Sequence, residues 1–188
     1  MWAGIDVGGR RKGFHCALVA GDEVRELFHS PAVGELVEWL RVQQPRLVAV
    51  DSPVSTAADG LASRESERLL VRARVCGIRY TPARAEVDRN DYYEWIRNGL
   101  ELYTALAVAE IPAIECFPTA SWSRLAGPRG TERRAAWTRR ALAALDLGGV
   151  PPRLNQDFRD AIGAALTARL HDEGATEAFG EIIVPRPR

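Results

Sequence analysis

Five acidic side chains stand where folding could gather them into one site: Asp6, Asp51, Glu115, Asp157 and Asp160. Asp6 lies within the stretch Gly-Ile-Asp-Val-Gly-Gly, and burying a carboxylate in an apolar strand is costly unless another group pairs with it. Asp51 directly follows a second apolar stretch, and Glu115 lies within a third. Hard divalent cations such as Mg²⁺ and Mn²⁺ prefer carboxylate oxygens and water as ligands. The five acids therefore predict a divalent-metal site.

Asp157 and Asp160 are three residues apart near the start of an expected helix, where they share one face and the helix dipole favours their ionised form. Two divalent cations about 4 Å apart can activate a water molecule and stabilise a leaving oxygen, as phosphodiester hydrolysis requires. We expect Asp6 to bridge both ions, while Asp51 and Asp160 each complete one metal shell. Asp157 is expected to hold an ion or its water, and Glu115 to act as a supporting group or general base.

Most of these acids also have an ordinary explanation when each is taken alone. Aspartate before Ser-Pro is typical of turns, which would account for Asp51. Asp157 could serve only as a charge complement to a helix start, and Glu115 could face water on an alternating strand. Asp6 has no such simple role. The joint placement of all five acids favours the metal site.

Basic residues beside these acids could contact the phosphate groups of a substrate. The predicted substrate-binding residues are Arg10, Arg11, Lys12, Arg64 and Arg68. The first three lie on the turn after Asp6, and the last two are one helical turn apart. Contacts of this kind give affinity without sequence selectivity. The arginines between residues 133 and 140 are more typical of a solvated helix face, and the three histidines are interpreted as structural: His15, His29 and His171.

Length and composition point to an ordinary globular protein. We expect one domain over residues 1–188, and the formal net charge of zero argues against a surface coated in basic charge. The three cysteines are too widely spaced for a disulfide framework or a zinc motif, which indicates a reducing compartment. The first residues lack the pattern of a signal peptide, and no apolar stretch reaches membrane-spanning length. We therefore expect a cytoplasmic protein with no membrane partner.

The order of expected elements predicts an α/β fold built on a mixed sheet. Three strands over residues 2–7, 14–20 and 23–28 form an antiparallel meander, because tight turns separate them. Two more strands, at 47–50 and 113–117, are expected to run parallel in the same sheet. Helices are predicted at 31–40, 64–75, about 90–109, 131–145 and 157–171. The result is a five-stranded sheet with helices on both faces, followed by an edge strand or tail over 180–188.

The sequence resembles the ribonuclease H-like superfamily, related to Holliday-junction resolvases, in its strand order and in the positions of its acids. More narrowly, it is similar to an uncharacterised family of predicted ribonuclease H-like nucleases. The similarity rests on Gly-Ile-Asp-Val-Gly-Gly, Val-Asp-Ser-Pro, the Arg-rich segment 64–68, Ile-Glu-Cys-Phe-Pro and Asp-Ala-Ile-Gly-Ala-Ala-Leu-Thr-Ala, and it covers nearly the whole chain. It implies a metal-dependent nuclease that uses Mg²⁺ or Mn²⁺ and acts on DNA or RNA.

Two further features belong to that resemblance. Relatives of this fold often dimerise, so a homodimer is compatible with it. Junction-resolving and RNA-cleaving relatives commonly carry glutamate at the second acidic position, where this chain has Asp51. Glu115 could compensate for the shorter side chain as an additional ligand or proton carrier.

Two other functions stay open at this point. Asp-x-Gly-Gly in a hairpin is also how ATPases of the actin and sugar-kinase type hold nucleotide phosphate and Mg²⁺, although those enzymes place two such domains around the nucleotide. The chain could instead be a non-catalytic nucleic-acid-binding module that keeps its acids for stability. Metal-dependent cleavage would separate the nuclease from both.

Overall fold

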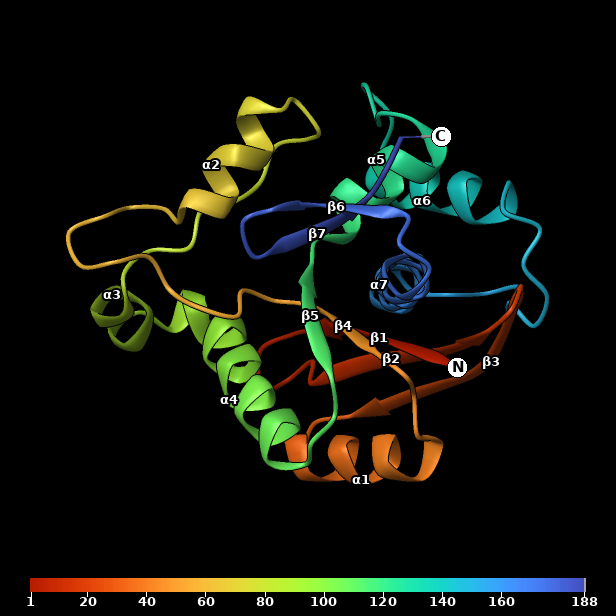
Figure 1. Cartoon of the computed structure of the whole chain (residues 1–188), viewed down its shortest axis with the longest axis horizontal. Helices are drawn as coiled ribbons and strands as arrows, with labels where there is room; N and C mark the ends of the chain where they lie inside the picture. Colours follow the sequence, from red (N-terminus) through yellow and green to blue (C-terminus); the bar gives the residue numbers. More distant parts are fainter. Residues whose placement is uncertain (188) are drawn as a thin grey trace.

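A computed structural model describes residues 1–187, and Arg188 lies outside the described residues. Its centre is one seven-stranded sheet with the strand order β3-β2-β1-β4-β5-β7-β6 (Figure 1). The strands are β1 (Trp2–Val7), β2 (Phe14–Ala20), β3 (Glu23–Ser30), β4 (Val48–Asp51), β5 (Ala113–Cys116), β6 (Thr176–Phe179) and β7 (Ile182–Pro185). The mixed α/β architecture and the opening meander are as the sequence predicts, since β1, β2 and β3 pair antiparallel.

The prediction of five strands is wrong, because the chain adds a hairpin after the last helix. β7 pairs parallel with β5, and β6 pairs antiparallel with β7, so β6 and not the final stretch forms this edge of the sheet. Both strands have only four residues, and β6 is the mixed-polarity segment Thr-Glu-Ala-Phe. A segment this short, without regular alternation, carries little strand signal of its own. Its pairing partner makes it a strand.

Helices cover both faces of the sheet, as expected (Figure 1). They are α1 (Val33–Gln43), α2 (Glu65–Arg72), α3 (Arg84–Arg89), α4 (Glu94–Val108), α5 (Pro118–Ala126), α6 (Arg134–Ala143) and α7 (Gln156–Asp172), with a short 3₁₀ turn at Asp91–Tyr93. α1 and α4 lie against one face, and α7 lies across the other with α5 and α6 beyond it. Among the described residues, no helix combines the length and apolar character needed to cross a membrane.

Two helical predictions need correction. The helix expected to start near residue 90 begins at Glu94, because α3 and the 3₁₀ turn occupy the preceding residues. α5 was not predicted, although Pro118 is its first residue and proline is favoured at that position. Its apolar face is short, but Trp122 within it is fully buried against α6 and α7.

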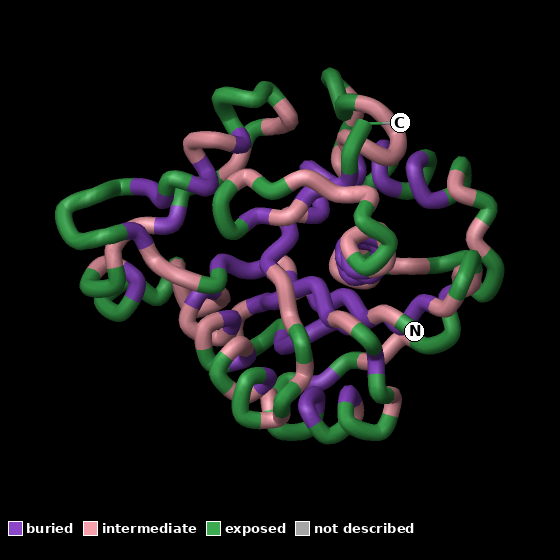
Figure 2. Tube along the Cα trace, viewed as in Figure 1, coloured by how far each residue is buried: buried purple, intermediate pink, exposed green. Residues whose placement is uncertain are grey.

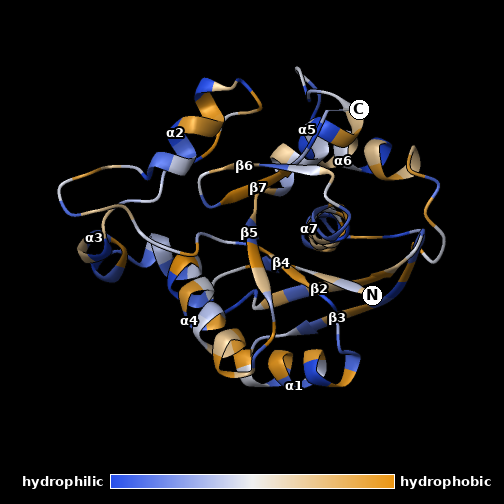
Figure 3. Ribbon diagram, viewed as in Figure 1, coloured by the Kyte–Doolittle hydropathy of each residue, from blue (hydrophilic) through white to orange (hydrophobic). Residues whose placement is uncertain are grey.

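Each face of the sheet has its own apolar core. On one face, Ala3, Ile5 and Val7 of β1 pack with residues of α1 and α4. On the other, residues of α5, α6 and α7 pack over β2, where Trp122 and Trp137 are the largest fully buried side chains. Figure 2 shows α7 as a largely buried element, and Figure 3 shows apolar residues along the strands beneath the helices. The alternation along β1 therefore leaves Trp2, Gly4 and Asp6 on the face that α7 covers.

Gly4 sets how closely α7 approaches the sheet. A side-chain carbon built at Gly4 would lie 2.1 Å from the carbonyl oxygen of Ala161 and 2.1 Å from the backbone nitrogen of Ala165. Real carbon atoms do not approach that closely, so only glycine allows this contact between the two backbones. Asp6 lies two residues further along the same face of β1 and is thereby held under the first turns of α7.

Candidate metal centre

Asp6 and Asp51 are neighbours across the parallel pair of β1 and β4. Gly4 and Ala49 occupy the same register two residues earlier, and both pack beneath α7. Side chains two residues apart on a strand share a face, so both carboxylates point toward α7. They also lie at the carboxyl ends of their strands, where α/β sheets usually build their sites. The structure thus brings Asp6 and Asp51 together on one face of the sheet, and their role as metal ligands stays a prediction.

The start of α7 supplies the other two aspartates. Asn155 caps the helix by accepting a hydrogen bond from the backbone N–H of Phe158, which places Asp157 in the first turn. Asp160 lies one turn further on, is 3% exposed, and accepts hydrogen bonds from Arg134 and Gln156 on Oδ2, each at 3.0 Å. Its other oxygen, Oδ1, is buried and accepts no well-formed hydrogen bond, although the nearby indole of Trp122 acts, against the larger effect of burial, to lower the pKa of this carboxyl. A buried carboxylate oxygen in that state is suited to a cation.

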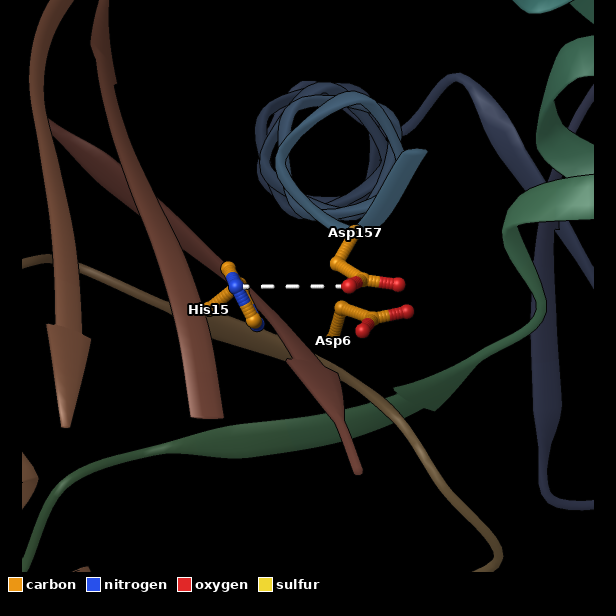
Figure 4. A group of neighbouring side chains, drawn as sticks. All are labelled: Asp6, His15 and Asp157. Carbon is orange, nitrogen blue, oxygen red and sulfur yellow. Dashed lines mark ion pairs between the residues drawn. The ribbon is translucent and has the colours of Figure 1, made fainter. Parts of the chain in front are cut away.

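His15 joins Asp6 and Asp157 in a group whose ligand atoms all lie within 4.8 Å of one another. Figure 4 shows the three side chains arriving from β2, β1 and the start of α7. His15 pairs directly with Asp6 across the β1–β2 hairpin, and its Nε2 lies 4.0 Å from Asp157 Oδ2. The sequence prediction treated His15 as structural. Pairing the two predicted strands about the turn at residues 8–13 would have placed it beside Asp6.

The four aspartates carry more negative charge than the two neighbouring cationic side chains, Lys12 and Arg134, can offset. Burial, followed by repulsion from Asp160 and Asp157, raises the pKa of Asp6 to about 7. Burial and repulsion from Asp6 and Asp160 raise the pKa of Asp51 well above its ordinary value. Burial also raises the pKa of Asp160 although Arg134 opposes the shift. Burial lowers the pKa of His15, which favours the neutral imidazole that binds metal.

These properties fit a divalent cation. Mg²⁺ and Mn²⁺ prefer oxygen ligands. Asp6 and Asp51 offer carboxylate oxygens from adjacent strands, and Asp160 offers a buried oxygen that accepts no well-formed hydrogen bond. A bound cation would offset the mutual repulsion that contributes to the raised pKa of Asp6 and Asp51. The residues of this chain therefore fit the metal that the sequence predicts.

Two cationic side chains reach the cluster from its rim. Lys12, on the β1–β2 turn, lies with Nζ 2.6 Å from Asp157 Oδ1, and this hydrogen bond raises the pKa of Lys12. Arg134, at the start of α6, lies 3.0 Å from Asp160 Oδ2. The other two residues predicted to bind substrate from this turn are Arg10, which contacts Glu94, and Arg11, which is exposed. The turn thus brings one cation, Lys12, into direct contact with the aspartates.

Glu115 does not join the four aspartates. It pairs with Val50, which belongs to the opposite face of the sheet from Asp51, so its side chain points away from α7. Both of its oxygens are taken there: Arg64 donates to each, and the backbone N–H of Val54 donates to Oε2. The expectation that Glu115 works beside the metal is corrected on this ground.

Arg64 and Arg68 also differ from their predicted roles. Arg64 is 5% exposed, and its guanidinium is paired with Glu67, Glu115 and Glu181. Arg68 lies against Glu65 and donates to Ser63. The buried guanidinium of Arg64 is therefore not available to a phosphate group, while Arg68 is held in local contacts at the start of α2. Arg64 instead ties the start of α2 to β5 and to the turn between β6 and β7.

Without metal, the protein is expected to lose stability as the pH rises from 4 to 7. Folded Asp6 keeps its proton up to about pH 7, whereas the unfolded chain releases it near 3.8, so ionisation disfavours the folded state. The full shift corresponds to about 4 kcal/mol. Urea unfolding in EDTA at several pH values measures the effect. His15 acts in the opposite direction, since its pKa is lowered.

The matched control for this prediction is Asp6→Asn, which removes the group and also relieves its repulsion of Asp51. Its free energy of unfolding is expected to change less with pH than that of the parent protein. A parent profile that is flat or rises between pH 4 and 7, and matches that of the variant, would contradict the assigned environment of Asp6.

Solved structures with a similar fold include those of RuvC from Thermus thermophilus. One is 21% identical, covers 92% of this chain and 95% of its own, and has a TM-score of 0.47. Another, T. thermophilus RuvC in complex with a Holliday junction substrate, is 16% identical, covers 93% of this chain and 96% of its own, and has a TM-score of 0.50. At this identity the likeness shows the ribonuclease H-like fold alone. No curated protein matches the sequence significantly.

A family model gives the assignment that sequence identity alone does not. The model described as "Protein of unknown function (DUF429)" matches residues 4–182. That range begins at Gly4, contains all four clustered aspartates, and ends within β7. The predicted membership of an uncharacterised family is confirmed, and the fold is shared with RuvC. The chain belongs to the DUF429 family.

Proposed function

We propose that this protein is a metal-dependent nuclease that hydrolyses phosphodiester bonds of nucleic acid with Mg²⁺ or Mn²⁺. The observation that carries the proposal is the convergence of Asp6, Asp51, Asp157 and Asp160 on one face of the sheet, with Asp160 Oδ1 buried and accepting no well-formed hydrogen bond. The fold shared with RuvC supports it, and the solved complex of RuvC with a Holliday junction makes nucleic acid the first substrate class to test.

Each aspartate has a position suited to one task. Asp6 is adjacent to Asp51 in the sheet and is repelled by both helix aspartates, so it is placed to share cations with all of them. Asp51 and Asp160 would hold the cations from either side, and Asp157 would hold a cation or its water. When bound, divalent ions activate the attacking water and stabilise the leaving oxygen.

His15 and the rim cations would complete the site. The neutral imidazole of His15 is near enough to Asp157 to share a ligand position or accept a proton from water. Lys12 and Arg134 already contact carboxylates of the cluster, and each could release its partner to a metal ion and contact the phosphate instead. They replace Arg64 and Arg68 as the proposed phosphate contacts of the site.

A cleavage screen tests the proposal. Labelled single strands, RNA–DNA hybrids, duplexes and branched DNA are incubated with the protein and Mn²⁺ or Mg²⁺, and EDTA should stop any cleavage. Asp51→Asn is expected to lower the rate by about 10²- to 10³-fold, because it weakens metal binding by about 3–4 kcal/mol in the transition state.

The matched control is Asp59→Asn, which changes an exposed acid in the loop before α2. It should cleave like the parent protein. If no substrate is cleaved with either metal, or if Asp51→Asn cleaves as fast as Asp59→Asn, the nuclease proposal fails.

A further inference from the structure

A cavity of about 620 Å³ opens directly beside the aspartates. Asp51 and Arg134 form part of its wall, and the segments 75–79 and 128–130 form other parts. Its volume is typical of sites for small molecules and cofactors. A site of that size suits one nucleotide unit, whereas duplex recognition depends on an extended surface that follows the grooves and backbone.

Two of the four arginines that line this cavity have no acidic partner among the described residues, and the carboxylates of Asp51, Glu67 and Glu115 line it as well. Arg79 and Arg129 are exposed, and neither forms an ion pair within residues 1–187. The contact recorded for Arg79 is with the ring of Tyr92, 5.0 Å from its centroid. Many other arginines of this chain are paired with carboxylates, as Arg64 and Arg68 are. Guanidinium groups left available beside a metal site suit a phosphate group.

The remaining wall suits a flat apolar group. Trp95 and Phe117 line the cavity together with Ile78. Nucleobases stack on aromatic side chains with little dependence on base identity. Thr119, also in the wall, has a buried Oγ1 with no hydrogen-bond partner, which a base or sugar could satisfy. One cavity thus offers arginines for a phosphate group and aromatic side chains for a base, and its wall includes Asp51, a proposed metal ligand.

We propose that this cavity binds one nucleotide unit, with its phosphate toward Asp51 and Arg134 and its base among the aromatic side chains. The inference rests on the proposed nuclease function and names its substrate: the end of a single strand, or a free nucleotide. At a strand end, the oxygen of a water molecule would bond to the phosphorus of the terminal phosphodiester, and the bond from that phosphorus to the oxygen of the remaining strand would break. The strand oxygen takes up the proton that the attacking water loses, so the products are a mononucleotide that keeps the phosphate and a strand shortened by one unit.

The binding test uses AMP as the probe, titrated into the whole protein with Mn²⁺ present. The double variant Arg79→Ala/Arg129→Ala is expected to bind AMP at least about tenfold more weakly than the parent protein. Arg139→Ala/Arg153→Ala is the matched control, because both arginines are exposed and line a separate cavity between α6 and α7. Equal weakening in both double variants, or no AMP binding by the parent, would overturn the proposal.

The cleavage test compares a linear single strand with a covalently closed circle of the same sequence. A strand-end site predicts that the linear strand releases mononucleotides while the circle stays intact. Equal cleavage of both would overturn the strand-end site and leave the nuclease function standing. AMP binding that depends on Arg79 and Arg129, with neither strand cleaved, would overturn the strand-end site and assign the cavity to free nucleotides, and the nuclease function would fail only if the full set of substrates in the cleavage screen were also left uncleaved.

Discussion

An Asp6→Asn variant is expected to be more stable than the parent protein without metal and inactive with it. At pH 8 the parent must ionise a buried carboxyl group whose pKa is raised to about 7 by burial and by two neighbouring aspartates. An uncharged amide of the same size avoids that cost, and the expected gain in free energy of unfolding is about 2–4 kcal/mol. The same change removes the carboxylate placed to share cations with Asp51 and the helix aspartates. Metal-dependent cleavage should fall about 10³-fold or more.

The two halves of this prediction are measured separately. Thermal unfolding in EDTA gives the stability change, and unfolding with added Mn²⁺ shows whether metal still stabilises the protein. The parent should gain stability from Mn²⁺ and Asp6→Asn should not, while Asp59→Asn should respond like the parent. If Asp6→Asn is stabilised by Mn²⁺ as strongly as the parent protein, Asp6 is not a metal ligand.

The second large effect is expected from Gly4→Ala, a change that adds one methyl group and alters no charge. That methyl carbon would lie 2.1 Å from two backbone atoms of α7, so the helix must move away from β1. The contact is between two backbones, which cannot rotate aside as a side chain can. We expect a loss of about 4 kcal/mol or more in free energy of unfolding, in the range reserved for severe core changes. Urea unfolding measures it.

Gly34→Ala provides the comparison for Gly4→Ala. Gly34 lies in α1, and a side-chain carbon there meets nothing within 4 Å. Alanine is the better helix former, so this variant should be unchanged or gain up to about 1 kcal/mol. If Gly4→Ala is as stable as Gly34→Ala and still binds Mn²⁺, the close approach of α7 does not hold the aspartates in place.

The sequence predicts the parts of this structure that depend on local pattern. The hairpin around residues 8–13, the buried strand that ends at Asp51 and the helix that carries Asp157 and Asp160 each have their own signal in turn residues or periodicity. Together these elements hold the four proposed metal ligands. The prediction succeeds there because a parallel neighbour strand and a covering helix are the usual surroundings of such segments in an α/β fold.

The predictions that failed depend on partners distant in the sequence. The face of a four-residue strand such as β5 is set by its register, so Glu115 could not be assigned to Arg64 from the sequence alone. The same limit applies to Arg64, whose three acidic partners come from α2, β5 and the turn after β6. β6 itself becomes a strand only by pairing with β7. In each case tertiary contact, not local propensity, decides the outcome.

The position of α7 along the chain also bears on protein synthesis. β1 is synthesised well before α7, the helix that covers it, which is complete only at Asp172. Until then, a nascent chain exposes the small and apolar residues of that face, and nascent surfaces of this kind are prone to aggregation. It also carries Asp6 and Asp51 without Asp157 and Asp160. The enzyme proposed here therefore has no complete set of ligands until translation has passed the start of α7.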